Sequence, residues 1–342
     1  MKILLIGGTG VISADITKLA AEKKNEVYVL NRGKTASALP YGVQSLVADI
    51  KDEQQTAAAI GDMHFDVVAD FIAFTEEDVA RDVRLFTGKT DQYIFISSAS
   101  AYQKPPVDYI ITESTPLSNP YWLYSRNKIA GESYLMEQFR HSGFPVTIVR
   151  PSHTYCKRSL PLAVKGASAW TVAKRILEEK QVMIQGDGNS LWTLTHSSDF
   201  AKGFYGLMGN IHAIGQAVHI TSDETVTWNQ IYGIIARALG KPLHAVHISS
   251  DFLVAAAPER FDFEGALLGD KSNPVVFDNS KLKRLVPDFC ATVRADVGLT
   301  ESVAYFLQNP QLQKEDTDFD IWCDTILKAR SNALAEIIQT VK

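Results

Sequence analysis

The sequence predicts an α/β protein built on a doubly wound parallel sheet. Short apolar runs alternate with helix-length segments through the first 150 residues. Most runs are continuously hydrophobic, which indicates strands buried on both faces and covered by helices. One more run of this kind arrives late in the chain. The predicted strands are Ile3–Ile6, Val27–Asn31, Gln44–Ala48, Phe65–Phe71, Tyr93–Ser97, Val146–Arg150 and Ala217–Thr221.

Composition excludes several classes of protein. The chain has 342 residues, 46% of them hydrophobic, which is enough for one large core or two coupled cores. A net charge of −5 without long runs of like charge argues against a broad surface for nucleic acid or anionic lipid. No apolar stretch approaches the roughly 20 residues of a membrane span.

The N-terminal residues and the spacing of the cysteines bear on the cellular location of the protein. Because a predicted strand follows Met1 directly, we expect no signal peptide and a cytoplasmic location. Cys156, Cys290 and Cys323 are far apart and lack metal-ligand spacing. This pattern favours reduced thiols over a disulfide framework, and no metal site is expected.

The alternation of strands and helices loosens after residue 150. We expect two interleaved lobes. The first comprises residues 1–155 with about 197–222, and a smaller C-terminal α/β lobe comprises 156–196 and 223–342. From Asp316 onward the sequence is typical of an amphipathic helix.

A glycine-rich loop, Gly7-Gly8-Thr9-Gly10, stands between the first predicted strand and a helical pattern over Val11–Glu22. Glycines there permit a tight turn and let the backbone approach a diphosphate, which then meets the helix N-terminus. This placement indicates a Rossmann-type fold that binds NAD or NADP, although a turn that needs glycine only for packing is the alternative. The residues expected at the cofactor from this loop are Gly7, Thr9, Gly10, Val11 and Ile12.

The end of the second strand bears on which dinucleotide is bound. An acidic residue there would select NAD, but the sequence has Asn31-Arg32, with Lys34 close by. We therefore favour NADP slightly over NAD, with Arg32 pairing to a 2′-phosphate. Alternatively, Arg32 stacks on adenine or points to water. Asp49, after the third strand, is placed to accept from the adenine amino group, or else to cap a helix starting at Lys51.

Three side chains form a candidate catalytic group. Tyr124 and Lys128 are four residues apart, so on a helix they share one face. An ammonium beside a phenol favours the phenolate and lowers its pKa from about 10 towards the range of a general acid/base. Ser98, after the fifth strand, adds a hydroxyl that could orient a carbonyl or alcohol. Tyr-x-x-x-Lys alone is common in helices, but its combination with the glycine loop is specific.

In this order the motifs resemble the extended short-chain dehydrogenase/reductase superfamily, in particular the NAD-dependent epimerase/dehydratase family. The resemblance implies that Tyr124 is the catalytic acid/base, that Lys128 bonds the nicotinamide ribose and tunes Tyr124, and that Ser98 bonds the reacting oxygen. Ser97 and Ser100 are the fallbacks for Ser98. The resemblance also assigns to the cofactor site Asn31, Arg32, Asp49, Ile50, Phe71, Ile72, Ala73, Pro151 and His153.

The second half departs from nucleotide-sugar epimerases. His153 and Cys156 stand where the family commonly has asparagine and glycine, and Trp192 replaces an arginine that binds the substrate diphosphate. Loss of a guanidinium removes a strong contact to phosphate, which disfavours a standard UDP- or dTDP-sugar. Lys165 could hold phosphate differently, or else lie on a solvated loop. The candidate substrate residues are Ser100, His153, Lys165 and Trp192; for Trp192 a core position, and for His153 simple packing, are the alternatives.

These features predict an NAD(P)-dependent oxidoreductase or epimerase acting on a sugar or nucleotide-sugar-like alcohol. Dehydration is disfavoured because Ala99-Ser100 stands where dehydratases often carry Asp-Glu. The alternative is a non-catalytic dinucleotide-binding protein, regulatory or RNA-associated, as in the chloroplast stem-loop-binding branch; nucleic acid is otherwise not expected. The resemblance also implies a homodimer through helices at Glu76–Phe86 and Trp122–Arg140.

Overall fold

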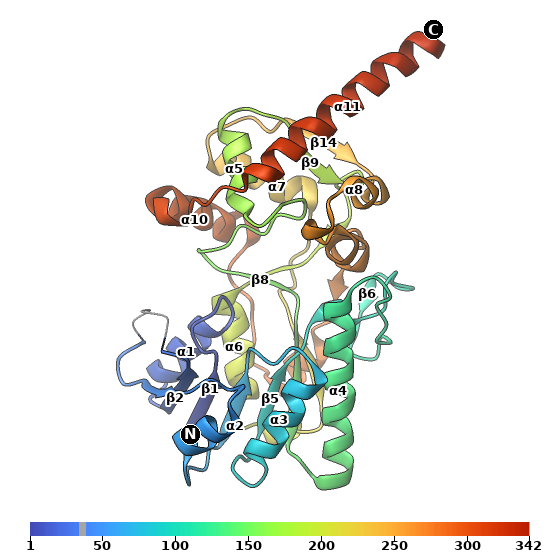
Figure 1. Cartoon of the computed structure of the whole chain (residues 1–342). Coiled ribbons are helices and arrows are strands. Elements are labelled where there is room, and N and C mark those ends of the chain that lie inside the picture. Colours follow the sequence, from blue (N-terminus) through green and yellow to red (C-terminus); the bar gives the residue numbers. More distant parts are fainter. Residues whose placement is uncertain (34–38, 342) are drawn as a thin grey trace. The chain divides into compact units, whose positions relative to one another are not determined.

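The computed structural model, which describes residues 1–33 and 39–341, contains a seven-stranded parallel sheet (Figure 1). Its strand order, β12-β7-β5-β4-β1-β2-β3, places β1 at the point from which the chain winds outward in both directions. The predicted doubly wound fold is therefore confirmed. The strands are β1 (Lys2–Ile6), β2 (Glu26–Asn31), β3 (Gln44–Val47), β4 (Val67–Asp70), β5 (Tyr93–Ile96), β7 (Val146–Pro151) and β12 (Ala217–Ile220).

Helices cover both faces of the sheet, because successive side chains of each strand point to opposite sides. Ile3 and Leu5 of β1 belong to one buried cluster, and Leu4 and Ile6 belong to the other. The first face carries α1 (Ser13–Glu22), α6 (Ser197–Leu207) and α9 (Ser280–Leu285). The second carries α2 (Glu53–Ile60), α3 (Glu76–Phe86) and α4 (Leu123–Ser142).

Local signals fix the ends of the helices on the second face. Thr75 and Asp78 form a capping box at the start of α3, and Gly143 ends α4 with φ of +72°. The alternative that Asp49 caps a helix from Lys51 is wrong. Helix α2 begins at Glu53, and its cap is the Asp52 carboxylate, because the chain makes a further turn before the helix starts.

The chain divides into two compact units. Unit 1 contains Met1–Cys156, Thr193–Thr225 and Val275–Val293; unit 2 contains Lys157–Trp192, Val226–Pro274 and Arg294–Lys342. Residues 275–293 are predicted from the sequence to belong to the second lobe, whereas in the structure they return to unit 1. In that segment β15 (Val276–Phe277) pairs with β6 (Ile110–Ile111). A strand of two residues carries no periodicity from which this return could be predicted.

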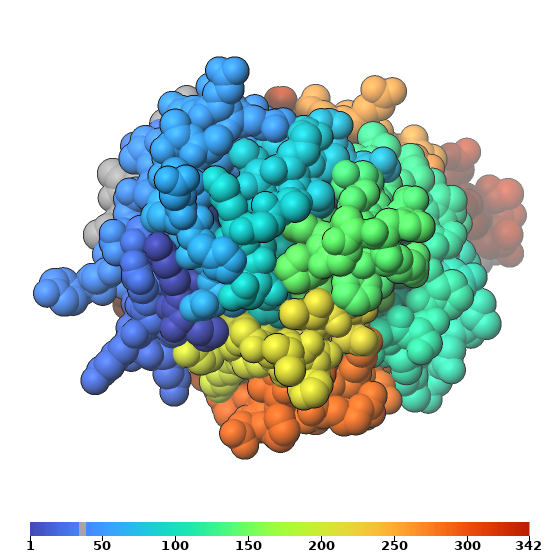
Figure 2. Space-filling view, turned by 90° about the horizontal axis from the view of Figure 1, so that it is seen from below, coloured from blue at the N-terminus to red at the C-terminus, as the bar shows by residue number. Residues whose placement is uncertain are grey.

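The returning segment is anchored again at α9. The Asn210 amide donates to the Leu285 carbonyl at 2.9 Å, so residues near 210 and 285 lie side by side on the face seen from below (Figure 2). Unit 1 also contains a small parallel pair of strands, β8 (His153–Tyr155) with β11 (Leu194–His196).

Unit 2 packs helices around two short pairs of strands. Helix α11 buries Phe319, Cys323 and Leu327 against its own unit, whereas its residues from Lys328 to Val341 are exposed. Among the residues that the structure describes, no helix is both long and apolar enough to cross a membrane. The elements are α5 (Ala169–Leu177), β9 (Val182–Gln185), β10 (Leu191–Trp192), β13 (Val226–Thr227), α7 (Trp228–Ala238), β14 (Ala245–Ile248), α8 (Ser250–Ala256), α10 (Ala295–Gln308) and α11 (Thr317–Val341).

Candidate functional site

The glycine loop is fixed by the side chain of Ser13. The Ser13 hydroxyl donates to the Gly7 carbonyl at 2.6 Å and accepts from the Gly10 N–H at 2.8 Å. Gly7 has φ of +82°, and a Cβ there would lie 2.7 Å from Cγ2 of Ile72. A small polar residue at position 13 therefore holds the loop closed, where a third glycine would only leave room.

The loop presents backbone donors to solvent. Among the residues described, no acceptor lies within hydrogen-bond distance of the N–H groups of Val11 and Ile12, which precede α1. Gly10 and Val11 are exposed, and Thr9 and Ile12 are half-buried. Unpaired N–H donors at a helix N-terminus can bind a diphosphate, and the glycines, which lack side chains, let it approach the backbone.

The ends of β2 and β3 continue this edge. Asn31 accepts from the Gly33 N–H at 2.7 Å, and Arg32 is exposed beside it; Lys34 lies outside the described residues. Asp49 is half-buried and accepts from the Lys51 N–H at 3.2 Å, while Ile50 is buried. This end of the sheet thus offers a guanidinium and a carboxylate beyond the loop.

The segment after β4 bends across the same edge. Phe71 is half-buried against Phe204, with ring centroids 5.5 Å apart, and Ala73 is buried. Ile72 exposes 40% of its surface and Phe74 exposes 47%. An apolar surface is thereby open to solvent next to the glycine loop.

Lys128 of α4 is buried beneath that segment, with 2% of its surface exposed. Its Nζ donates to the carbonyls of Ala73 at 2.6 Å and Ile96 at 2.7 Å. It also lies 4.6 Å from the centroid of the Phe74 ring and 5.8 Å from that of Tyr124. The third proton of the ammonium has no hydrogen-bond acceptor among the described residues.

Burial lowers the pKa of Lys128 to about 8. The nearby charges of Asp70, Asp78 and Glu132 act in the opposite direction, because they favour the ammonium. The group therefore changes its charge close to neutral pH. Tyr124 lies one turn earlier on α4, half-buried between Trp122 and Phe74, whose ring centroids are 4.9 and 6.2 Å away.

A chain of serine hydroxyls joins β5 to α4. Ser125 donates to the Ser100 hydroxyl at 2.7 Å, and the Ser100 and Ser98 hydroxyls lie 2.8 Å apart. Ser98 also accepts from the Ser100 N–H at 3.1 Å and is half-buried, whereas Ser100 is 4% exposed. Ser97 bonds the buried Glu132. Of the three serines considered from the sequence, Ser98 is the least buried residue.

The remaining candidates lie further along the chain. Pro151 is buried at the end of β7, and His153 is half-buried at the start of β8. In unit 2, burial lowers the pKa of Lys165, and the charge of Lys271 adds to the effect. Trp192 is 2% exposed and packs on Trp228 with ring centroids 5.0 Å apart, which agrees with a core position.

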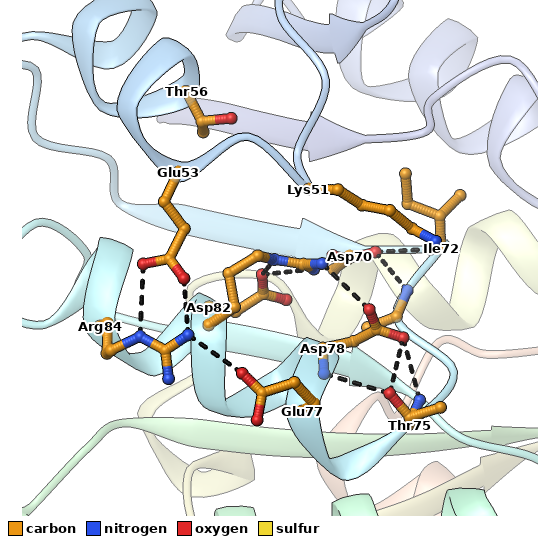
Figure 3. Close-up of polar contacts among 12 residues, drawn as sticks. Lys51, Glu53, Thr56, Asp70, Ile72, Thr75, Glu77, Asp78, Asp82 and Arg84 are labelled. Atoms are coloured by element: carbon orange, nitrogen blue, oxygen red, sulfur yellow. Dashed lines mark hydrogen bonds and ion pairs between the residues drawn. The ribbon is translucent and has the colours of Figure 1, made fainter.

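Sequence reasoning missed Asp70, the last residue of β4. Its side chain is fully buried, and Oδ1 accepts from the N–H groups of Ile72 at 2.5 Å and Ala73 at 2.8 Å. Figure 3 shows this carboxylate turned towards the chain that follows the strand. A carboxylate that ends a run of apolar residues, Val67-Val68-Ala69, was the available signal.

Comparison with known proteins decides the family. The model of the NAD dependent epimerase/dehydratase family matches residues 3–220. The chain belongs to this family. Among the solved structures, the chain is similar to that of UDP-glucuronic acid 4-epimerase from Bacillus cereus, in complex with UDP-glucuronic acid and NAD. That structure is 19% identical and covers 90% of this chain and 99% of its own, with a TM-score of 0.70, which supports the fold.

Two curated relatives of this epimerase/dehydratase family member differ in function. The 2'-dehydrokanamycin reductase of Streptomyces kanamyceticus is 25% identical over 84% of this chain and 80% of its own length. The chloroplast stem-loop binding protein of 41 kDa b of Arabidopsis thaliana is 26% identical over 77% of this chain and 68% of its own. The family match indicates an NAD-dependent enzyme of the short-chain dehydrogenase/reductase type.

Two glycine variants test the geometry of the loop. Gly42 has φ of +83°, and no atom lies within 4 Å of the point that a Cβ would occupy, so Gly42→Ala should cost about 1 kcal/mol of unfolding free energy from backbone strain alone. Gly7→Ala adds a collision with Ile72 and should cost about 1–3 kcal/mol more. Urea denaturation of both variants measures the difference, and equal losses would contradict the close approach at Gly7.

Proposed function

We propose that the protein is an NAD(P)-dependent oxidoreductase or epimerase that acts on a sugar-like or nucleotide-linked alcohol. One observation carries the proposal: Lys128 is held by two carbonyls with one ammonium proton uncommitted among the described residues, at the strand edge that also bears the glycine loop. A buried cation with a pKa of about 8 is costly, and functional sites commonly contain such groups.

The residues around the loop would hold the dinucleotide. The N–H groups of Val11 and Ile12 bind the diphosphate, and Asp49 accepts from the adenine amino group. Lys128 donates its remaining proton to the nicotinamide ribose. Nicotinamide, when bound, supplies the site that gives or takes a hydride. The exposed Arg32 favours NADP slightly over NAD, because it can pair with a 2′-phosphate.

Tyr124 and Ser98 would act on the substrate oxygen. Tyr124 transfers the hydroxyl proton, and the ammonium 5.8 Å from its ring favours the phenolate. Ser125 donates to Ser100, which leaves the Ser100 proton to point at Ser98. Ser98 already accepts from the Ser100 N–H, so its own proton is the donor left for a substrate carbonyl.

The candidate substrate residues other than Tyr124 and Ser98 narrow the class of substrate. His153 and Lys165 are retained as candidate contacts, whereas the burial of Trp192 counts against stacking on a substrate. Because an arginine for a diphosphate is absent at position 192, we favour an alcohol other than a standard UDP-sugar. A homodimer through α3 and α4 and a cytoplasmic location belong to the same proposal.

An RNA-associated protein is the second candidate. The similarity to the chloroplast stem-loop binding protein favours it. The net charge of −5 counts against it, since RNA affinity depends on cationic contacts to phosphate.

Substitution of the proposed acid/base tests the chemistry. Tyr124→Phe should lower turnover at least about 100-fold while leaving dinucleotide affinity within about twofold, because only the proton transfer is lost. Turnover would be followed by NAD(P)H absorbance and product analysis over a panel of sugar alcohols and nucleotide sugars. Tyr41→Phe, at an exposed tyrosine, is the control. Turnover that persists in Tyr124→Phe would contradict the mechanism.

The charge of Lys128 predicts a pH dependence. The neutral amine has two protons, both taken by Ala73 and Ile96, so only the ammonium can donate a further hydrogen bond to the ribose. Dinucleotide affinity should therefore be constant at low pH and fall as the pH rises through the Lys128 pKa of about 8. Fluorescence titration with NADH and NADPH from pH 6 to 10 measures this. Lys128→Met should bind weakly at every pH; a wild-type midpoint that survives in this variant would disprove the assignment.

A further inference from the structure

Asp70 fixes the backbone of the turn that contacts Lys128. Its Oδ1 accepts from the N–H groups of Ile72 and Ala73, so the carboxylate defines the turn that follows β4. The carbonyl of Ala73, at the end of that turn, accepts from Lys128 Nζ at 2.6 Å. Two hydrogen bonds, joined through the backbone of Ala73, therefore connect the Asp70 carboxylate to the Lys128 ammonium.

We propose that Asp70 is a positioning residue: it aims the Ala73 carbonyl at Lys128, and its negative charge keeps Lys128 protonated for the bond to the dinucleotide. The inference deepens the proposed function and rests on it. Replacement of Lys128 tests the proposed function and replacement of Asp70 tests the inference, so the two can be tested separately.

Asp70 is itself held by a buried network on α3 and β5. Arg81 Nη2 lies 3.5 Å from Asp70 Oδ2 and 2.8 Å from Asp82 Oδ1, and Arg81 Nε donates to the same Asp82 oxygen at 3.0 Å. Tyr93 donates to Asp82 Oδ2 at 2.5 Å. All four side chains are within the interior, and Arg81 Nη2 lies between the carboxylates of Asp70 and Asp82.

This network contains two carboxyl groups, Asp70 and Asp82, but one guanidinium, that of Arg81. Burial and the charge of Asp70 raise the pKa of Asp82 well above its ordinary value. Burial also raises the pKa of Asp70, but there two backbone N–H groups and Arg81 favour the carboxylate. Asp70 therefore has two backbone donors that favour its charged form, and the two carboxyl groups titrate as a pair.

Other acids around Lys128 are already compensated. Asp78 of α3 accepts from the N–H groups of Phe74 and Thr75 and pairs with Arg81 at 3.0 Å. Glu132 of α4 forms a bidentate pair with Arg150. Asp70 lacks a guanidinium of its own, since Arg81 bonds Asp82 and Asp78 more closely. Removal of its charge should have the largest effect on Lys128.

The experiment compares the pH midpoint of dinucleotide affinity in variants of the full chain. Asp70→Asn keeps an oxygen for the two N–H groups but removes the charge, so the midpoint should fall by about one pH unit with affinity below pH 7 nearly unchanged. Asp70→Ala removes the acceptor as well and should weaken binding about tenfold below pH 7, because the turn loses its anchor. NADH or NADPH, whichever the wild type binds more tightly, is the probe.

Two further variants keep the test falsifiable if Asp70→Asn does not fold. Asp82→Asn neutralises the other buried carboxyl of the network, which is not among the charges that act on Lys128, and should leave the midpoint at the wild-type value. Glu77→Gln, an exposed acid of α3 paired with Arg84 at 3.3 Å, is the matched control and should do the same. Circular dichroism monitors the fold of each variant.

The outcomes separate the inference from the proposed function. A wild-type midpoint that Lys128→Met abolishes and Asp70→Asn leaves in place overturns the inference alone. A lowered midpoint in Asp82→Asn assigns the charge to Asp82 and also overturns it. A wild-type affinity that is independent of pH and equal to that of Lys128→Met overturns the role of Lys128, and the inference with it.

Discussion

The buried ammonium of Lys128 is the interaction on which the site depends. Its hydrogen bonds to Ala73 and Ile96 join α4 to the chain after β4 and to the end of β5. An isolated charge in the interior is costly, so these carbonyls and the carboxylates around them are needed for the ammonium to remain. In satisfying Lys128, the chain also brings the Ala73 turn, the serine hydroxyls and Tyr124 to one edge of the sheet.

The parallel sheet explains why these groups and the glycine loop share that edge. Strands β1, β4 and β5 are neighbours and run in the same direction, so the segments after them emerge on the same side. Gly7 follows β1, Asp70 ends β4 and Ser98 comes just after β5. The Cβ that Gly7 lacks would meet Ile72, so the glycine loop and the turn fixed by Asp70 are packed against each other.

Local patterns allowed most of the fold and part of the site to be predicted. Continuous apolar runs and the glycines identified the sheet, and helical spacing placed Tyr124 and Lys128 on α4. The Asp70, Arg81 and Asp82 network was not predictable, because its members come from two elements and meet only in the tertiary structure. The same applies to the serine chain. The return of residues 275–293 to unit 1 depends on the two-residue pairing of β15, which leaves no pattern in the sequence.

The most direct test of this account is a crystal structure with NAD(P) bound. The diphosphate should lie at the N–H groups of Val11 and Ile12, and a ribose hydroxyl should lie within hydrogen-bond distance of Lys128 Nζ while that atom keeps its bonds to Ala73 and Ile96. A dinucleotide bound elsewhere, or a Lys128 that leaves both carbonyls and does not reach the ribose, would contradict it.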